Sequence, residues 1–149
     1  MTRSPEHSQR RHFPVLRPVQ TRWMDNDHYG HVNNAAYYSY FDTAVNGYLM
    51  DATGADIRTF DAIGIVAETS CRYLSEISFP SMLYVGLRLE KLGNRSVVYE
   101  LGLFCEEAQA PSALGRFVHV YLDGNARKPV AIPAPIRAAL LPLQRPQDR

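Results

Sequence analysis

Cysteine is scarce in this chain. Only two of the 149 residues are cysteines, Cys71 and Cys105, and neither belongs to a CxxC pair or to a histidine cluster with metal-ligand spacing. This scarcity argues against a disulfide framework and against a zinc site built on thiolates. We expect both thiols to be reduced and buried in apolar strands, and we expect no metal or other cofactor.

An excess of one charge and long apolar runs are also lacking. Sixteen basic and fifteen acidic side chains leave a formal net charge of +1, which gives no general attraction for nucleic acid or an anionic membrane. No window approaches the ~18–20 apolar residues of a membrane span, and the N-terminal stretch MTRSPEHSQRRHFP has no apolar signal-peptide core. We therefore expect a cytoplasmic protein whose partners include neither nucleic acid nor membrane.

The length and composition are those of one globular domain. Of the residues, 46% are hydrophobic and 21% are charged, which is enough to bury a core, and no internal repeat is present. Because residues 1–13 are polar and lack periodicity, we expect a disordered N-terminal tail there. We expect a single domain over 14–143 and a short C-terminal tail over 144–149.

Residues 33–51 have the period of a helix. Tyr37, Phe41, Ala44 and Tyr48 recur at helical spacing, with polar side chains on the opposite face. The pattern predicts one long, mostly buried helix. The asparagine at position 33 or 34 can cap it, since an amide oxygen accepts hydrogen bonds from first-turn N–H groups.

The rest of the chain reads mainly as strands. Alternation and turn residues predict strands over 15–23, 65–74, 83–90, 97–105 and 114–122, and Pro18 favours an edge position for the first. Four prolines between Pro129 and Pro142 keep the helix PIRAALL short. The sequence thus predicts an α+β fold in which a curled antiparallel sheet wraps one long central helix. One helix shields only one face of such a sheet, so we also expect dimerisation.

The stretch DNDHYGHVNN, residues 25–34, joins the first strand to this helix. A helix N-terminus presents unpaired N–H groups and partial positive charge, so it attracts anions, including an oxyanion formed during a reaction. Gly30 permits close approach of a ligand, and Asp27 could act beside it on a carbonyl substrate. The residues alone leave a second interpretation open, in which the two aspartates form turns, His31 is a core histidine and Asn33 is a plain cap.

A longer stretch resembles a known family. The run RWMDNDHYGHVNNAAYYSYFDTA is similar to the signature of the 4-hydroxybenzoyl-CoA thioesterase-like branch of the hotdog-fold acyl-CoA thioesterases. Later segments, among them VAETSCRYL and GRFVHVYLD, resemble the same family, so the resemblance covers nearly all of residues 15–140. It implies the hotdog fold and hydrolysis of an acyl-CoA to free acid and CoA. It also implies a homodimer or a dimer-of-dimers tetramer with sites at the subunit interface.

The resemblance assigns roles to particular residues. It implies that Asp27 is the catalytic carboxylate and that Arg95 contacts the phosphates of coenzyme A. The implied oxyanion hole comprises Gly30, His31, Val32 and Asn33. The implied wall of the acyl pocket comprises Tyr29, Asn34 and Tyr37. Glu68, in a strand, could face the site from the partner subunit and orient a water. The connection YLSEISFPSML departs from the family pattern.

Thioester hydrolysis requires little machinery. The leaving thiol has a pKa of roughly 8.5 by analogy with cysteine, so one carboxylate and about two backbone donors suffice. The chain has no GxSxG motif, which disfavours an α/β-hydrolase, and it lacks the helix motif of hotdog dehydratases and hydratases. The alternatives are a hotdog protein that binds an acyl thioester without cleaving it, a structural subunit with a decayed site, and a thioesterase that acts on an acyl-carrier-protein thioester.

Overall fold

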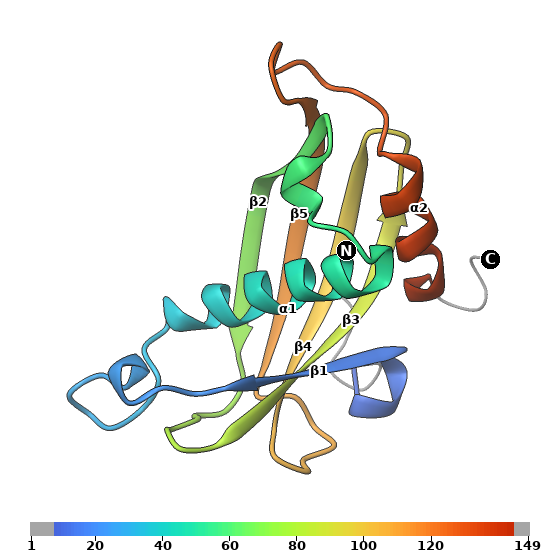
Figure 1. Cartoon of the computed structure of the whole chain (residues 1–149). Helices are drawn as coiled ribbons and strands as arrows, with labels where there is room; N and C mark the ends of the chain where they lie inside the picture. Colours follow the sequence, from blue (N-terminus) through green and yellow to red (C-terminus); the bar gives the residue numbers. More distant parts are fainter. Residues whose placement is uncertain (1–7, 145–149) are drawn as a thin grey trace.

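A five-stranded antiparallel sheet forms the framework of the protein (Figure 1). The computed structural model describes residues 8–144. The strands follow the order β1-β3-β4-β5-β2 and have the bounds Val15–Gln20 (β1), Ala62–Tyr73 (β2), Met82–Leu92 (β3), Ser96–Cys105 (β4) and Ala113–Asp123 (β5). The helices are α1 (Ala36–Thr53) and α2 (Ala134–Leu140), with the 3-10 turns η2 (Arg10–His12), η3 (Trp23–Asp25), η4 (Ile57–Thr59) and η5 (Leu141–Leu143).

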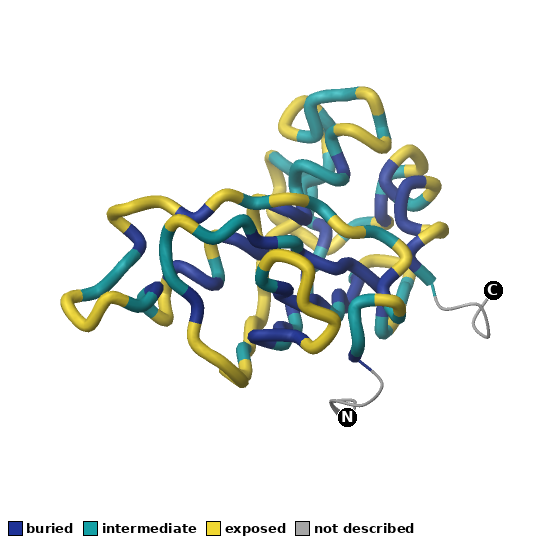
Figure 2. The backbone as a smooth tube through the Cα atoms, turned by 90° about the horizontal axis from the view of Figure 1, so that it is seen from below, coloured by how far each residue is buried: buried dark blue, intermediate teal, exposed yellow. Residues whose placement is uncertain are grey.

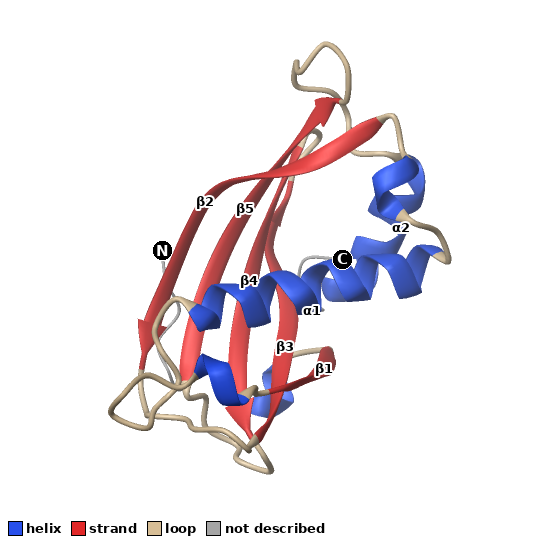
Figure 3. Ribbon diagram, turned by 60° about the vertical axis from the view of Figure 1, so that its left-hand side comes forward, coloured by secondary structure: helices blue, strands red, loops and turns tan. Residues whose placement is uncertain are grey.

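Helix α1 lies across one face of the sheet, here called the helix face (Figure 3). Its apolar stripe, including Tyr37, Phe41 and Ala44, packs in one cluster with inward side chains of the strands. The Phe41 ring lies so close to the backbone of β5 that a Cβ at Gly115 would be 2.7 Å from it. The arrangement of one antiparallel sheet with a helix is consistent with the expected α+β hotdog fold.

The helix begins three residues later than expected. Asn33 lies outside it, because its backbone N–H and its side-chain Nδ2 both donate to the Asp25 carbonyl oxygen, each at 2.8 Å. Its Oδ1 still accepts a hydrogen bond from the Ala36 N–H at 3.0 Å, so Asn33 satisfies a first-turn donor as predicted. The helix ends at Thr53 and is capped by Gly54, whose φ of 66° is left-handed.

The five expected strands are present with shifted bounds. Strand β1 is an edge strand, as Pro18 predicted, but it stops at Gln20 because the next residues turn into η3. Strand β2 begins at Ala62 rather than at residue 65. The short helix expected near the C-terminus is α2, and it is tied to α1 by a 2.6 Å hydrogen bond from the Tyr48 hydroxyl to the Ala139 carbonyl.

The expectation of a disordered tail over 1–13 does not hold for residues 8–13. Ser8 and Phe13 are buried, and Phe13 covers the sheet face opposite α1, where a Cβ at Gly86 would be only 2.6 Å from its ring. The Arg88 guanidinium stacks on the same ring, 4.3 Å from its centroid. Two glycines in neighbouring strands make this notch, Gly86 and Gly102, so packing keeps the segment in place. Residues 1–7 and 145–149 lie outside the described part of the chain.

Strand β2 is an unusually exposed edge. Seven consecutive residues, 64–70, are exposed, so side chains on both of its faces meet solvent. In Figure 2 the buried backbone runs through the middle of the molecule and exposed segments surround it. Cys71 in this strand and Cys105 in β4 are free thiols, but both are only half-buried, so the expectation that they are core residues was wrong. Within residues 8–144 no helix has the length and apolarity of a membrane span.

Candidate functional site

The stretch 25–34 forms a compact loop beyond the β2 edge of the sheet (Figure 1). It follows β1 through η3 and leads into α1, and an antiparallel bridge between Asn26 and Val32 closes it. The connection after β2, residues 74–81, packs against it. The loop therefore stands where the N-terminus of α1 meets the end of an exposed edge strand.

Asp25 is the buried anchor of this loop. Its side chain is 3% exposed, and its carboxylate accepts hydrogen bonds from Arg22 Nη2 at 2.8 Å and from the Tyr40 hydroxyl at 2.6 Å. It also accepts from the Arg22 backbone N–H at 3.1 Å. Because Tyr40 belongs to α1, the carboxylate links the loop to the helix. This agrees with the structural role expected for the first aspartate.

The surroundings of Asp25 favour its charged form. Burial opposes ionisation, but hydrogen bonds from Arg22 and Tyr40 outweigh it and lower the pKa of this carboxyl below its ordinary value. Burial, together with donation to the anion, raises the pKa of the Tyr40 hydroxyl far above its ordinary value. The pair is therefore a carboxylate held by a neutral phenol and an arginine.

Asp27 has a different environment. One carboxylate oxygen, Oδ1, accepts from the Tyr29 N–H at 2.9 Å and, more weakly, from the His31 N–H at 3.4 Å. The other oxygen, Oδ2, accepts no hydrogen bond from any residue within 8–144, and the side chain is half-buried. One oxygen thus fixes the orientation of the carboxylate while the other is available to a water or a carbonyl carbon.

The N–H groups expected to stabilise an oxyanion, those of residues 30–33, have hydrogen-bond partners within the protein. Gly30 donates to the Asp27 carbonyl at 3.1 Å, His31 to the Asp27 carboxylate, Val32 to Ile77 at 2.9 Å and Asn33 to Asp25 at 2.8 Å. Three of these donors are paired with backbone carbonyls, which makes them less suitable for a substrate oxygen, and the oxyanion hole at these residues stays a prediction.

The next two N–H groups, of Asn34 and Ala35, donate to no acceptor within residues 8–144. They are the central residues of the turn that begins α1, where an Ala36 N–H to Asn33 carbonyl bond of 3.1 Å closes the turn. The positive end of the α1 dipole lies here. The Tyr73 hydroxyl, from the end of β2, donates to the Asn34 carbonyl at 3.0 Å and fixes that peptide. This turn is the better candidate for stabilising an oxyanion.

Gly30 has a conformational role that the sequence did not specify. Its φ is 88°, which non-glycine residues rarely adopt, and no atom lies within 4 Å of where a Cβ would be. The glycine is needed for the turn and leaves open space above it. Its carbonyl accepts from Ser78 Oγ at 2.9 Å.

The connection after β2 braces the loop, and sequence reasoning missed these residues. Besides the contacts of Ile77 and Ser78, the Phe79 N–H donates to Asn26 Oδ1 at 3.1 Å, and the Phe79 ring meets Trp23 edge-on. The signal was the departure of YLSEISFPSML from the family pattern. That departure marked the segment without revealing its contacts.

The two histidines of the loop are near its surface. His31 Nε2 lies 3.1 Å from a Glu76 carboxylate oxygen, and its side chain is 42% exposed, so it is not the core histidine of the second interpretation. His28 packs beside Tyr29, with ring centroids 4.0 Å apart. Neither arrangement supplies a buried proton carrier.

The three expected acyl-pocket residues divide into exposed and buried ones. Tyr29 is 75% exposed, and Asn34 is exposed at the mouth of the loop. Tyr37 is buried against Tyr73, with ring centroids 4.8 Å apart, and burial raises the pKa of its hydroxyl to about 12. Tyr37 and Tyr73 form an aromatic wall next to the turn that carries the Asn34 N–H.

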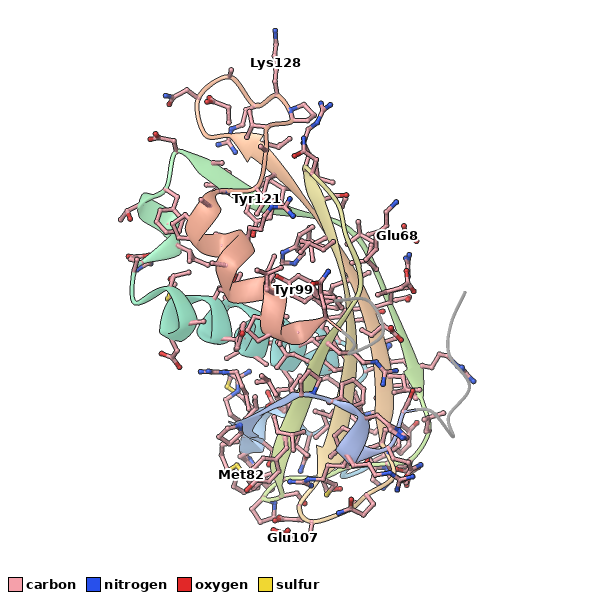
Figure 4. All side chains as sticks on the ribbon, turned by 90° about the vertical axis from the view of Figure 1, so that its right-hand side faces the viewer. Glu68, Met82, Tyr99, Glu107, Tyr121 and Lys128 are labelled. Atoms are coloured by element: carbon pink, nitrogen blue, oxygen red, sulfur yellow. The ribbon has the colours of Figure 1, made fainter. Side chains whose placement is uncertain are left out.

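The structure does not bring Glu68 or Arg95 to Asp27 within one chain. Glu68 is paired in register with Val118 on the face away from α1, and Figure 4 shows it on the side opposite Tyr99 and Tyr121. Its side chain is 70% exposed, with Arg116 at 4.0 Å. The Arg95 carbonyl accepts from the Tyr121 N–H at 2.8 Å, which places Arg95 at the opposite end of β5 from the helix start.

Comparisons with known proteins agree on one family. A sequence model of the thioesterase-like superfamily matches residues 19–140. The crystal structure of the PA5185 protein from Pseudomonas aeruginosa is 48% identical, covers 93% of this chain and 96% of its own, and superposes with a TM-score of 0.89. A thioesterase from Thermus thermophilus, complexed with coenzyme A and Zn, is 31% identical over 88% of this chain and 94% of its own, with a TM-score of 0.72.

A second Pseudomonas aeruginosa protein, PA2801, is 28% identical over 85% of this chain and 98% of its own, with a TM-score of 0.78. No curated protein sequence matches the chain. The family resemblance inferred from the Arg22–Ala44 run is confirmed.

The buried Asp25 carboxylate gives a prediction about stability. Replacing Asp25 with Asn should lower the free energy of unfolding by about 2 kcal/mol at neutral pH, because Arg22 and Tyr40 lose a buried charged acceptor. The pKa of Asp25 is depressed in the folded state, so its stabilisation is complete above the ordinary value of 3.8 and is lost as pH falls through the lower folded value.

Urea unfolding of wild type and Asp25→Asn over a descending pH series measures this difference. The gap between the two proteins should close in acid. The exposed Asp61 provides the control, since Asp61→Asn should match wild type throughout. A gap that is absent at neutral pH, or that widens in acid, would contradict the anchoring role.

Proposed function

Because the chain belongs to the thioesterase-like superfamily, we propose that it hydrolyses an acyl-CoA thioester to a free acid and coenzyme A. One observation supports this most: within residues 8–144, Asp27 has a carboxylate oxygen without a hydrogen-bond partner, and the same loop leads to the Asn34 and Ala35 N–H groups, which also have none. A carboxylate and an oxyanion site on the positive end of a helix are the two parts that thioester hydrolysis needs.

The proposed reaction places the thioester carbonyl oxygen at the N–H groups of the helix-start turn. Asp27 Oδ2 then either attacks the carbonyl carbon or removes a proton from the water that does. In the first route the carbon–sulfur bond breaks, a mixed anhydride forms and water later cleaves it. In both routes the sulfur leaves as a thiolate, whose conjugate acid has a pKa of roughly 8.5 by analogy with cysteine, so no general acid is required.

Coenzyme A as the carrier is supported by the relative from Thermus thermophilus, which is a thioesterase described in complex with coenzyme A. An acyl-carrier-protein thioester presents the same pantetheine arm and is the alternative carrier. The free thiols Cys71 and Cys105 fit a reducing compartment, and we propose the cytoplasm as the location. No cofactor takes part in the proposed reaction.

We also propose that the active unit is a homodimer joined through β2. The other edge, β1, is short and carries Pro18, which protects it from pairing. Strand β2 has 12 residues, no proline and two exposed faces. Antiparallel pairing of two β2 strands about a two-fold axis places the start of one beside the end of the other.

This pairing would complete the site. The end of β2 at Tyr73 adjoins the helix-start turn, while Arg95 lies level with Gly64 near the start of β2, about 25 Å away along the strands. In the dimer, the partner subunit's Arg95 therefore comes to the end of the joined sheet that carries the first subunit's Asp27, and we propose that it contacts the phosphates of coenzyme A while the pantetheine arm reaches to Asp27. Glu68 remains near the axis on the outer face, which gives the partner-subunit role expected for it little geometric support. A tetramer built from two such dimers is equally compatible with this arrangement.

The activity is tested by release of free thiol. Wild type should release thiol from members of an aliphatic and aromatic acyl-CoA panel, and Asp27→Asn should reduce kcat at least about a hundredfold, because the amide is neither nucleophile nor base. Glu107→Gln, at an exposed carboxylate between β4 and β5, is the matched control and should retain activity. Saturable binding of the esters without thiol release by wild type would instead establish a non-catalytic binding protein.

The revised oxyanion site has its own test. Asn34→Pro removes the Asn34 N–H, and proline is compatible with the first central position of the turn. We expect kcat to fall about a hundredfold with little change in KM, because the lost bond forms mainly in the transition state. Asn34→Ala, which keeps the N–H, should stay near wild type. Equal kcat values for Asn34→Pro and Asn34→Ala would show that the Asn34 N–H does not stabilise the transition state.

The dimer prediction concerns the β2 edge. Lysines in place of Ile65 and Val66, which are 38% and 43% exposed, should block strand pairing and give a monomer by sedimentation equilibrium. Thiol release should fall in the same protein. Leu16→Lys, on the other edge strand, should leave the dimer intact. A monomeric wild type, or a dimeric double variant, would contradict pairing through β2.

A further inference from the structure

A cavity of about 140 Å³ lies on the helix face of the sheet, away from the Asp27 loop. Its walls come from the C-terminal half of α1, the η4 segment, the start of β2, the end of β5 and α2. In Figure 1, η4 crosses the same face of the sheet as α1. Most of the wall is apolar, with Leu49, Ile57, Phe60 and Ile136 among its residues.

Two hydrogen-bonding side chains in this wall have no partner. Tyr121 and His119 come from alternate positions of β5, and each is only 3% exposed. Within residues 8–144, the Tyr121 hydroxyl makes no hydrogen bond and His119 Nε2 is sealed from solvent without a partner. Figure 4 shows Tyr121 on the helix side of the sheet. Because buried polar groups are nearly always satisfied, His119 Nε2 requires a partner that residues 8–144 do not supply, and the Tyr121 hydroxyl beside it can form a further hydrogen bond.

The other polar groups of the wall are engaged. The guanidinium of Arg58 is held by both oxygens of Asp56, each at 2.9 Å, and Asn46 Nδ2 donates to Asp42. Burial lowers the pKa of His119, which keeps the imidazole neutral and able to accept or donate one hydrogen bond. The polar part of the cavity is thus a neutral imidazole beside a phenol.

Local packing keeps this arrangement open. A Cβ at position 64 would lie 3.3 Å from the Tyr121 hydroxyl, so the glycine there leaves room for the phenol. A cavity of roughly 150 Å³ with apolar walls is large enough for benzene. The space therefore suits one six-membered ring or a branched alkyl group of similar size, and the imidazole and phenol suit one oxygen on it.

We propose that this cavity is a binding site for a compact apolar group that carries one hydrogen-bonding oxygen, held by His119 and Tyr121. The site does not depend on hydrolysis at Asp27. Two sources share this chemistry, the far end of a bound acyl group and a free small molecule.

The test uses phenol and toluene, which share a ring and differ in the hydroxyl, in methyl NMR titrations of the full chain. Phenol should shift the methyl signals of Ile57 and Ile136 saturably and should bind about tenfold more tightly than toluene, as one additional hydrogen bond in a buried site predicts. Tyr121→Phe and His119→Phe should each reduce this preference at least about threefold.

Tyr99→Phe is the matched control. The Tyr99 ring lies 5.1 Å from the His119 ring and its hydroxyl also has no partner within residues 8–144, but Tyr99 does not line the cavity. This variant should keep the full preference for phenol. Equal affinity for the two probes, no saturable shift at Ile57 and Ile136, or a preference that survives both cavity variants would overturn the proposal and leave water as the occupant.

The source of the ligand is decided by non-hydrolysable thioethers of coenzyme A with hydroxyl-terminated chains of increasing length. Shifts at the same isoleucine methyls with one chain length assign the cavity to the acyl end. Shifts with phenol alone assign it to a free small molecule. Both arms measure binding, so the result stands whether or not the thiol-release assay finds activity.

Discussion

The buried carboxylate of Asp25 is the interaction on which the rest of the site depends. The carboxylate joins Arg22, which follows the first strand, to Tyr40 in the helix, and the backbone carbonyl of the same residue binds Asn33 at the start of the helix. An anion in this position is stable because charged and phenolic donors surround it. Because Asp25 carries the structural role, Asp27 Oδ2 keeps no partner within residues 8–144, as the proposed hydrolysis requires.

The two aspartates of this small loop use their carboxylate oxygens differently. Asp25 uses both carboxylate oxygens for the framework, whereas Asp27 uses one and presents the other. The contacts of Asp25 with Tyr40 and Asn33 also fix the start of α1. Preorganised donors of this kind are effective because no reorganisation is needed when charge develops.

Much of this arrangement could be predicted from sequence. The helical spacing of Tyr37 and Phe41 and the alternation of the later strands gave the elements, since burial on one face imposes those periods. Proline at position 18 gave an edge strand. The prediction of Asp27 as the reactive carboxylate came from the family resemblance, and it remains a proposal.

What could not be predicted depends on contacts between distant segments. The sequence gives no sign that the N–H groups of Val32 and Asn33 are paired. In the structure they donate to the carbonyls of Ile77 and Asp25, so they are less suitable for an oxyanion. The packing of Phe13 on Gly86 was invisible for the same reason, because a glycine notch needs two strands in register. The sequence places His119 and Tyr121 in a strand, but it does not reveal the cavity that their side chains line.

Residues 77–79 hold the loop of residues 25–34 in place through hydrogen bonds. The loop around Asp27 is bonded to Ile77, Ser78 and Phe79 through Val32, Gly30 and Asn26. Its stiffness is thus inherited from a connection some fifty residues away in the chain. Relatives that share every residue of the signature but differ in this connection would hold the same carboxylate less rigidly. Variation there is a route by which closely related enzymes can diverge in rate while their reactive residues stay the same.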